Sequence, residues 1–484
     1  MRILPVLLVV CAFAFVAAAG VAALAADKPN IILILADDLG YGDVSCYNPD
    51  SKIATPRIDA LAAQGARWTD AHTPCSVCSP TRYGLLTGRY CWRTRLKSGV
   101  LNGYSRALVE PGRATLATLT AAAGYRTACF GKWHLGLGPI EPADYAGSLS
   151  PGPMATGFQE SFVLPASLDM PPYVFVENEK PTAFPSQTIA ASAMRRYGGN
   201  GFWREGAIAP GFRHVDTLPA IAQRSVEFIA RQQADKPFFL YLPLTAPHTP
   251  WMPTDEYRGR SKVGFYGDFV MQVDAVVGQV LDTLEKQKLA EQTLVIFTSD
   301  NGAHWLATDI EQWKHRANAN WRGMKADIWE GGHRVPFIVR WPKVVTAGSR
   351  REELVCLTDV FATVAEILGL RLAPGEAEDS VSFLAAITGE PAKYPPRESI
   401  VHQAADGTLG IRQGAWKLAT KLGSHGFSEP KQVTPDPDGP QGQLYNLTDD
   451  PAETRNRWLG EPAIVKKLLA LLEEGQAAER TRPE

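Results

Sequence analysis

One short segment near residue 80 combines residue types and a spacing that suit covalent catalysis. Cys78 is followed by Ser79-Pro80-Thr81-Arg82 and then, after two residues, by Leu85-Leu86-Thr87-Gly88-Arg89. Taken alone, Cys78 fits either an ordinary buried cysteine or a thiolate nucleophile, and a thiolate would want a paired histidine. Cys75 and Cys78 also form a C-x-x-C pair. No second C-x-x-C and no H-x₃₋₅-H motif accompanies this pair, which argues against a zinc site. The thioredoxin-like sequence context expected of a redox pair is also missing.

Two pairs of neighbouring residues, each with side-chain oxygens, offer ligands for a metal ion. Asp37-Asp38 comes directly after an apolar run, and Asp300-Asn301 follows a second one. Hard divalent cations prefer carboxylate and amide oxygens, and adjacent buried carboxylates repel each other unless a cation is present. Turn chemistry explains either pair alone, but two pairs at two strand ends favour a metal site. Calcium fits better than zinc, because no Cys/His ligand set accompanies the carboxylates.

Three further side chains suit anion binding and proton transfer. Lys132 and His134 are two residues apart, so in an extended segment they project to the same side. An ammonium beside an imidazole suits an anionic oxygen and a proton transfer. His248 lies between prolines in a rigid turn, a placement that suits a general acid. Each of these also has an ordinary interpretation as a surface or core residue.

Two more cations complete the candidate set. Arg82 lies one helical turn after Cys78, so we expect it to donate a hydrogen bond back toward an oxygen at residue 78. Lys325 precedes Trp329-Glu330-Gly331-Gly332. It is either part of the anion site or a solvated lysine.

The elements that must position these residues follow from hydrophobic periodicity. Unbroken apolar runs of strand length predict buried strands, and longer periodic stretches predict helices. Strands are expected at 30–36, 67–72, 125–130, 237–244, 293–299 and 335–341, with shorter alternating ones at 409–413 and 416–419. Helices are expected at 55–62 with Thr55 as N-cap, and at 79–86, 115–123, 215–233, 263–288, 358–368 and 463–477. A Pro- and Gly-rich excursion at 139–210 is expected to cover the site.

This alternation predicts an α/β fold with a mixed, mainly parallel central sheet sandwiched by helices. Ligands bind beyond the carboxyl ends of the strands in such sheets. The motifs at Asp37-Asp38, Lys132 with His134, His248 and Asp300-Asn301 all follow predicted strands. We therefore expect them to meet at one edge of the sheet.

Composition and the N-terminus indicate an exported enzyme. The 484 residues are 45% hydrophobic and 21% charged, with a net charge of −2, so no global field points to nucleic acid or an anionic membrane. Arg2, an apolar stretch and Ala23-Leu24-Ala25 predict a signal peptide over residues 1–26, and an uncleaved anchor is the alternative. We expect a periplasmic or extracellular protein with no stable membrane partner. A catalytic domain is predicted over 27–394 and a C-terminal subdomain over 395–484.

The ordered motifs of the chain resemble those of the type I sulfatases, which belong to the alkaline phosphatase superfamily. The resemblance covers about residues 28–456 and rests on NIILILADDLGYGD, CSPTRYGLLTGR, GKWHLG, APHTP, TSDNG, MKADIWEGG and LYNLTDDPAE. It implies an alkaline-phosphatase-like fold with a smaller C-terminal antiparallel sheet. It also implies that Cys78 is oxidised after synthesis to formylglycine, an aldehyde, by a dedicated maturation enzyme.

The resemblance assigns a role to each candidate residue. It implies one calcium ion bound by Asp37, Asp38, Asp300, Asn301 and the converted Cys78. It implies that Arg82, Lys132, His134, His248 and Lys325 bind the sulfate and the nucleophile. One hydroxyl of the hydrated aldehyde would attack sulfur, with His248 protonating the departing alcohol, alone or with Lys325. His134 would then deprotonate the second hydroxyl to expel sulfate.

The expected substrate is a sulfated small molecule or glycan, and a sulfated carbohydrate is favoured. Two alternatives stay open: a phosphate or phosphonate ester hydrolase on the same fold, and a non-catalytic exported binding protein. Sugar stacking or anion contacts are possible roles for several residues, although packing or solvated loops explain them equally well. These residues are Trp92, Trp203, Trp251, Trp305, Trp313, Trp321, Arg93, Arg95 and His304.

Overall fold

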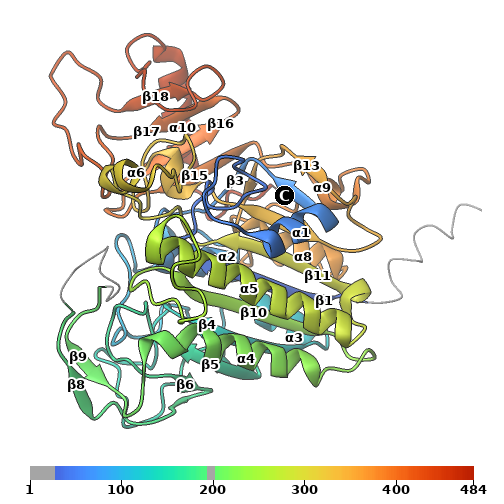
Figure 1. Ribbon diagram of the computed structural model, residues 1–484. Helices are drawn as coiled ribbons and strands as arrows, with labels where there is room; N and C mark the ends of the chain where they lie inside the picture. Colours follow the sequence, from blue (N-terminus) through green and yellow to red (C-terminus); the bar gives the residue numbers. More distant parts are fainter. Residues whose placement is uncertain (1–27, 193–201, 484) are drawn as a thin grey trace, which may run out of the picture.

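The computed structural model describes residues 28–192 and 202–483, and Figure 1 shows their arrangement. The predicted signal peptide at 1–26 lies outside the described residues. Within the described part of the chain, no helix combines the length and apolar character needed to cross a membrane.

A ten-stranded mixed sheet forms the centre of the molecule. Its strands lie in the order β13 (Ser349–Arg351), β2 (Ala66–Trp68), β12 (Phe337–Arg340), β11 (Thr293–Ser299), β1 (Asn30–Asp37), β10 (Phe238–Pro247), β4 (Arg126–Lys132), β5 (Glu160–Leu164), β6 (Val176–Glu177) and β7 (Lys180–Pro181). The five strands from β11 to β5 run parallel. Antiparallel pairs flank them on both sides.

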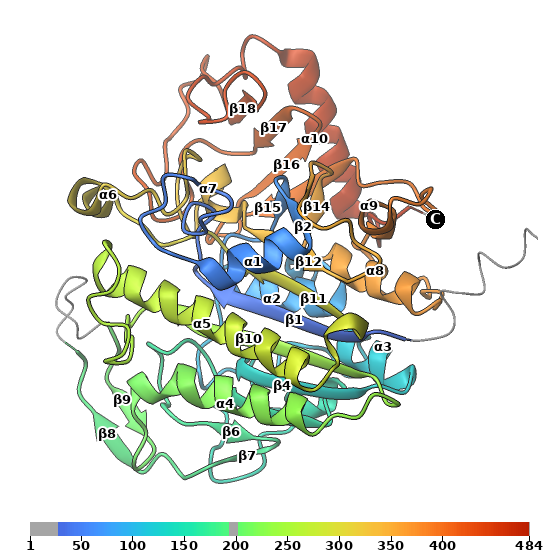
Figure 2. The ribbon, with the colours of Figure 1, turned by 45° about the vertical axis from the view of Figure 1, so that its right-hand side comes forward.

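Helices cover both faces of the sheet, as Figure 2 shows. One face packs against α1 (Pro56–Gln64), α4 (Thr217–Ala230) and α5 (Gly264–Lys286), and the other lies under α2 (Cys78–Thr87), α3 (Leu116–Ala122) and α8 (Asp359–Ile367). Strand β1 supplies both cores, because alternate side chains point to opposite faces. Ile31, Leu33 and Leu35 join one core, while Ile32 and Ile34 join the other. This double burial explains why the strand is an unbroken apolar run.

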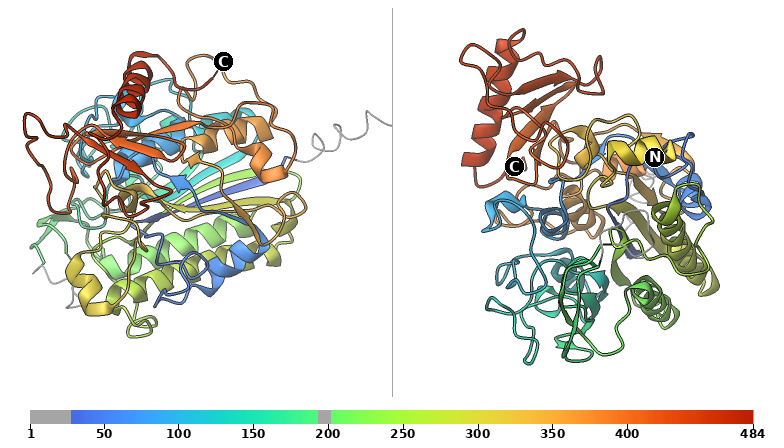
Figure 3. Two further views of the ribbon diagram at one scale, coloured as in Figure 1. Left: turned by 90° about the horizontal axis from the view of Figure 1, so that it is seen from above. Right: turned by 60° about the vertical axis from the view of Figure 1, so that its left-hand side comes forward.

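A second, smaller sheet forms the C-terminal part, seen beside the main sheet in Figure 3. It is four-stranded and antiparallel, with β15 (Ser399–Gln403), β16 (Leu409–Gln413), β17 (Trp416–Ala419) and β18 (Gln443–Asn446) in sequence order. Helix α10 (Pro462–Ala477) packs against β16 and β17. The predicted fold class is therefore confirmed, while the boundary near residue 395 stays a prediction.

The excursion after β4 contains little regular structure. It includes β5 to β7 and a two-stranded sheet of β8 (Gln187–Ile189) and β9 (Gly206–Ile208). The remaining short elements are α6 (Ala307–Trp313), α7 (Glu330–His333), α9 (Leu384–Thr388) and β14 (Val355–Cys356), with 3₁₀ turns at Cys91–Arg93, Met154–Thr156, His214–Asp216 and Ala290–Gln292.

One local expectation is wrong, and a second, Thr55 as the N-cap residue of α1, is confirmed in position only. The strand predicted over 67–72 is two strands in different sheets, because β3 (Ala71–His72) leaves the main sheet to pair with β14. Between them Asp70 accepts bonds from arginines of two other segments, which draws the chain aside. Thr55 precedes α1 but its side chain does not cap the helix, since its hydroxyl bonds Asp59 and Ser45 instead.

Candidate active site

The carboxyl ends of four neighbouring parallel strands bring the predicted motifs together. Asp37 is the last residue of β1, and Lys132 is the last residue of β4. His248 follows β10 directly, and Asp300 follows β11 directly. Because β11, β1, β10 and β4 are adjacent in that order and parallel, these ends lie at one edge of the sheet. The convergence expected from the sequence is present.

Three buried ion pairs hold this edge together. The Nζ of Lys132 lies 2.9 and 2.8 Å from the two carboxylate oxygens of Asp37. The Nζ of Lys325 lies 2.7 and 2.9 Å from those of Asp38. All four side chains are buried. Lys325 therefore belongs to the site and is not a solvated lysine.

Arg82 makes the third pair, and its partners differ from the expectation. Its Nη2 and Nε lie 2.7 and 3.0 Å from Oδ2 of Asp300, and its Nη1 donates to the backbone oxygen of Lys132 at 2.7 Å. Among the described residues it makes no hydrogen bond to residue 78. Its position one turn along α2 instead lets it reach across to the end of β11.

The ion pairs determine the charge state of the acidic residues. Burial acts to raise the pKa of Asp37, but the attraction of Lys132, His248 and Arg82 outweighs it and holds that pKa below its usual value. The pKa of Asp38 is also held below its usual value, because the attraction of Lys325 and other cations outweighs the effect of burial. Both groups are therefore carboxylates at neutral pH.

The donor set fits a hard divalent cation. Asn301 is buried and its Nδ2 donates to Oδ1 of Asp38 at 2.7 Å, which leaves Oδ1 of Asn301 without a hydrogen-bond partner among the described residues. A buried amide oxygen without a partner is costly, and a cation satisfies it. Asp38 has a φ of 63°, in the left-handed region. Its backbone N–H donates to Oδ1 of Asp300 at 3.2 Å, and its carboxylate lies within 4.8 Å of ligand atoms of Asp37, Cys78 and His248.

Cys78 lies beside the carboxylates at the first position of α2. Its Sγ is 3.9 Å from Oδ1 of Asp37. Burial raises the pKa of the Cys78 thiol to about 12, although Lys132 and Lys325 act in the opposite direction. An unmodified thiol at this position stays protonated at neutral pH, so it is a poor nucleophile. The described cysteines are all free, so the Cys75–Cys78 redox pair is not formed.

His134 is arranged as a proton acceptor. It is fully buried, and its Nε2 lies 2.6 Å from the backbone oxygen of Leu101, which makes Nε2 the protonated nitrogen. Its Nδ1 then carries a lone pair, and this atom has no hydrogen-bond partner within the described chain. Burial, reinforced by the charges of Lys132 and Arg82, holds the pKa of His134 well below its usual value. The imidazole is therefore neutral at neutral pH and able to accept a proton.

His248 is held from several sides. Its Nδ1 lies 2.6 Å from the backbone oxygen of Thr249, so this nitrogen carries a proton. Its Nε2 lies 3.3 Å from Oγ of Ser167 and 3.7 Å from Oδ2 of Asp38. The Nε2 atom faces the carboxylates, which suits an imidazole that exchanges a proton with a ligand there.

Two residues at this site, Ser167 and Asp169, were not expected from the sequence. Both lie in the excursion after β5, which does cover this site. Asp169 has one oxygen 4.0 Å from Nδ1 of His248 and an ion pair with Arg204. The surrounding segment has no periodicity that would have singled out either residue.

Several residues considered for substrate contact are used elsewhere. Trp251 and Trp305 are buried and pack around Tyr266. Arg93 forms a bidentate pair with Asp379. Packing is therefore the correct interpretation for the two tryptophans, and Arg93 is neither solvated nor free, because it is held in an ion pair.

Comparison with known proteins identifies the class. The sulfatase family model matches residues 29–370. The chain is 34% identical over 481 residues to an N-acetylgalactosamine-6-O-sulfatase of Bacteroides thetaiotaomicron, an alignment that covers 92% of this chain and 93% of that one. It is also 32% identical over 488 residues to human arylsulfatase A, covering 95% and 89% of the two chains.

A solved structure agrees with these matches. It comes from work on the metabolism of multiple glycosaminoglycans by B. thetaiotaomicron and superimposes with a TM-score of 0.82 at 32% identity, covering 93% of this chain and 100% of that one. The chain belongs to the sulfatase family. It is a sulfuric ester hydrolase, similar to both carbohydrate sulfatases and arylsulfatases.

The environment of His134 leads to a prediction about pH. Since its pKa is depressed, the neutral form persists below pH 6.5, the ordinary histidine value. We expect kcat for an aryl sulfate to fall with acid only below that pH, because His134 is expected to act in the step that releases sulfate. His134→Gln should lower kcat by about 10²-fold or more. The control His425→Gln changes a histidine that is bonded to Asp406 and Leu422 and to no residue of the site. It should retain activity, and a His134→Gln enzyme of normal rate would contradict the assignment.

Proposed function

We propose that this protein is an exported sulfatase that hydrolyses sulfate monoesters of a carbohydrate, with residue 78 acting as formylglycine beside one calcium ion. The observation that carries the proposal is the buried edge where three carboxylates meet three cations around residue 78. Without a metal these charges balance. A divalent cation would give the site a net positive charge, which suits an anionic sulfate group.

The chain's own residues divide into anion binding and proton transfer. Lys132 and Lys325 are placed to stabilise charge that develops on the sulfuryl oxygens. Arg82 anchors Asp300 and so fixes one carboxylate. His248, whose Nε2 faces the carboxylates, protonates the departing alcohol when its ring carries a proton on both nitrogens. His134, held neutral by burial, removes a proton from the group at residue 78.

Two further components are proposed. Formylglycine at residue 78, when hydrated, would supply an oxygen nucleophile and a second hydroxyl. Asp37, Asp38, Asp300 and Asn301 would hold calcium, which would supply positive charge for that nucleophile and for the bound ester. The high pKa of the unmodified thiol supports the need for conversion.

A carbohydrate substrate is supported by relatives and by the surroundings of the site. A matched relative is named for an amino sugar sulfate. Next to His134 and Asp169 lies a cavity of about 580 Å³ lined by, among others, Asn102, Tyr104 and Arg204. Polar groups beside an aromatic ring suit a sugar ring. A sulfated glycan or small molecule and a formylglycine-generating enzyme are thus the proposed partners, and the predicted leader supports export.

The first test examines residue 78 by mass spectrometry of the tryptic peptide from protein made with its own maturation system. We expect the aldehyde or its hydrate in active enzyme. Cys78→Ala should abolish turnover while the thermal unfolding midpoint stays near that of the parent. Active enzyme that carries only the thiol would refute the formylglycine mechanism.

The second test removes the metal. Dialysis against a calcium chelator should lower both the activity and the thermal midpoint, because a ligand that binds only the folded state no longer stabilises it. Calcium should restore both. Asn301→Ala should raise the calcium concentration needed by about tenfold, roughly 1.4 kcal/mol, whereas the exposed control Asn320→Ala should not. Full activity in the chelated enzyme would exclude the calcium site.

The third test addresses the substrate class. Aryl sulfate, aryl phosphate and a panel of sulfated mono- and disaccharides should be compared by kcat/KM, with a sulfated sugar ranking first and the phosphate last. Tyr104→Ala should raise KM for that sugar about five- to tenfold through the lost ring contact, and should leave aryl sulfate turnover unchanged. A preference for phosphate would favour the alternative hydrolase, and turnover of aryl sulfate alone would reject the sugar.

A further inference from the structure

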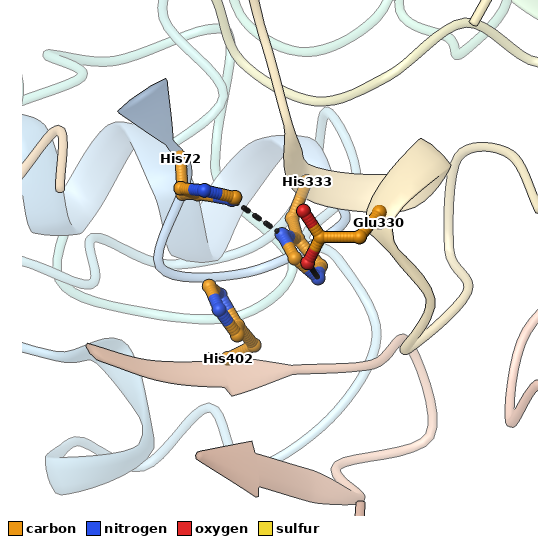
Figure 4. Close-up of side chains that lie close together, drawn as sticks. All are labelled: His72, Glu330, His333 and His402. Carbon is orange, nitrogen blue, oxygen red and sulfur yellow. Dashed lines mark hydrogen bonds and ion pairs between the residues drawn. The ribbon is translucent and has the colours of Figure 1, made fainter. Parts of the chain in front are cut away.

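A second cluster of ligand-type side chains lies outside the active site. It consists of His72 on β3, Glu330 and His333 on α7, and His402 on β15, and Figure 4 shows the four side chains together. All four are buried. One nitrogen or oxygen of each lies within 4.8 Å of those of the others. None takes part in the chemistry proposed above.

Two of the imidazoles face each other through the same type of nitrogen. Nδ1 of His72 lies 3.0 Å from Nδ1 of His333. The far nitrogen of each ring has its own acceptor: Nε2 of His72 lies 2.8 Å from Asp70, and Nε2 of His333 lies 3.2 Å from the backbone oxygen of Ile328. When both far nitrogens are protonated, two lone pairs converge on one point, where a cation would satisfy both. Histidine ligands of metals are commonly held by an outer carboxylate or carbonyl in this way. Two donors compete with this state: Nη1 of Arg412 lies 3.2 Å from Nε2 of His72, and Lys417 approaches Nε2 of His333.

His402 supplies an independent indication of a ligand. The side chain is fully buried, and neither ring nitrogen has a hydrogen-bond partner within the described residues. Its ring lies parallel to that of His333, with centroids 3.7 Å apart, and Figure 4 places it within the cluster. Burying an imidazole with neither nitrogen satisfied is unfavourable. A bound metal would satisfy one of them.

We propose that this cluster binds a zinc ion through His72 Nδ1, His333 Nδ1, His402 and Glu330. Imidazole and carboxylate donors in a buried four-ligand set suit Zn²⁺. Two nitrogens on one tetrahedral zinc lie about 3.3 Å apart, given Zn–N bonds of about 2.0–2.1 Å, so the His72–His333 pair is already near the required spacing. The parallel ring of His402 has to rotate out of the stack to direct a lone pair at the same ion.

Lys417 would compete with a metal ion for His333 and Glu330. Its Nζ lies 2.9 Å from Nε2 of His333, 3.1 Å from Glu330 and 2.8 Å from Glu453. Without metal, Lys417 donates to Nε2 of His333, which then donates from Nδ1 to His72. That arrangement leaves His402 unsatisfied. With metal, Nε2 of His333 donates to Ile328 and Lys417 keeps its ion pair with Glu453.

The charges around the cluster set the expected strength of binding. Asp70, Glu330 and Glu453 are paired with Arg334, Arg412 and Lys417. These six charges already balance, so the carboxylates leave no net negative charge to attract a cation. We therefore expect the affinity for the ion to come from the imidazole nitrogens. This distinguishes the cluster from the calcium site, which offers carboxylate oxygens and favours a harder cation.

The ion would connect three segments that surround the loop before Cys78. The backbone nitrogen of Thr73 donates to His333, and that of Ser76 donates to Gln403, next to His402. Zinc would thus join the two-stranded β3–β14 sheet and α7 to the C-terminal sheet, and would brace residues 73–77. Its role would be structural, because none of its ligands reaches the reacting group.

The test uses the full protein, stripped of metal and then saturated with calcium so that the aspartate site is filled. After zinc addition and desalting, elemental analysis should find about one zinc per chain, and the thermal midpoint should rise. His402→Phe keeps the stacked ring volume but removes the ligand. It should lose most of the zinc and the thermal shift, as should His72→Gln.

Two controls separate this site from others. His425→Gln removes a histidine outside the cluster and should retain the zinc. Asn301→Ala weakens the calcium site and should also retain it. Cobalt(II) added in place of zinc should give the intense visible absorption of a tetrahedral site, and His402→Phe should remove it. The proposal is overturned if calcium-saturated protein binds no zinc, or if folded His402→Phe and His72→Gln, judged by circular dichroism, bind as much as the parent.

Discussion

The structure depends on one constraint: six charged side chains are buried together at the edge of a parallel sheet and must remain paired. An unpaired buried charge costs several kcal/mol, so removal of either partner is far more damaging than removal of both. The pairs Lys132–Asp37, Lys325–Asp38 and Arg82–Asp300 therefore act as a unit. Each pair joins segments far apart in sequence. The geometry of the site is thus coupled to the order of the strands.

The same burial sets the proton chemistry. It holds His134 neutral and the Cys78 thiol protonated, while the neighbouring cations keep Asp37 and Asp38 ionised. The site therefore contains a proton acceptor, His134, and fixed positive charges, but its thiol is protonated and is not a nucleophile at neutral pH. The encoded thiol is the one component that does not suit the task. This mismatch is the physical argument for a modified residue 78.

Much of this edge could be predicted from the sequence, because its residues directly follow apolar strands. Asp37, Lys132, His248 and Asp300 required only strand ends and the rule that parallel strands present their carboxyl ends together. The antiparallel direction of β12 and the departure of β3 could not be predicted, since both depend on pairing with distant segments. Ser167 and His402 gave no periodic signal, and only tertiary packing brings them to their partners.

Burial of residue 78 also limits when it can be modified. Cys78 is 1% exposed. Residues far apart in the sequence, among them Lys132 and Lys325, lie close to it. A maturation enzyme needs access to this side chain and to the Pro80-Thr81-Arg82 that follows, which are also buried in α2. Local opening of this region would expose the paired charges. If residue 78 is converted as proposed, this burial favours conversion before the chain has folded.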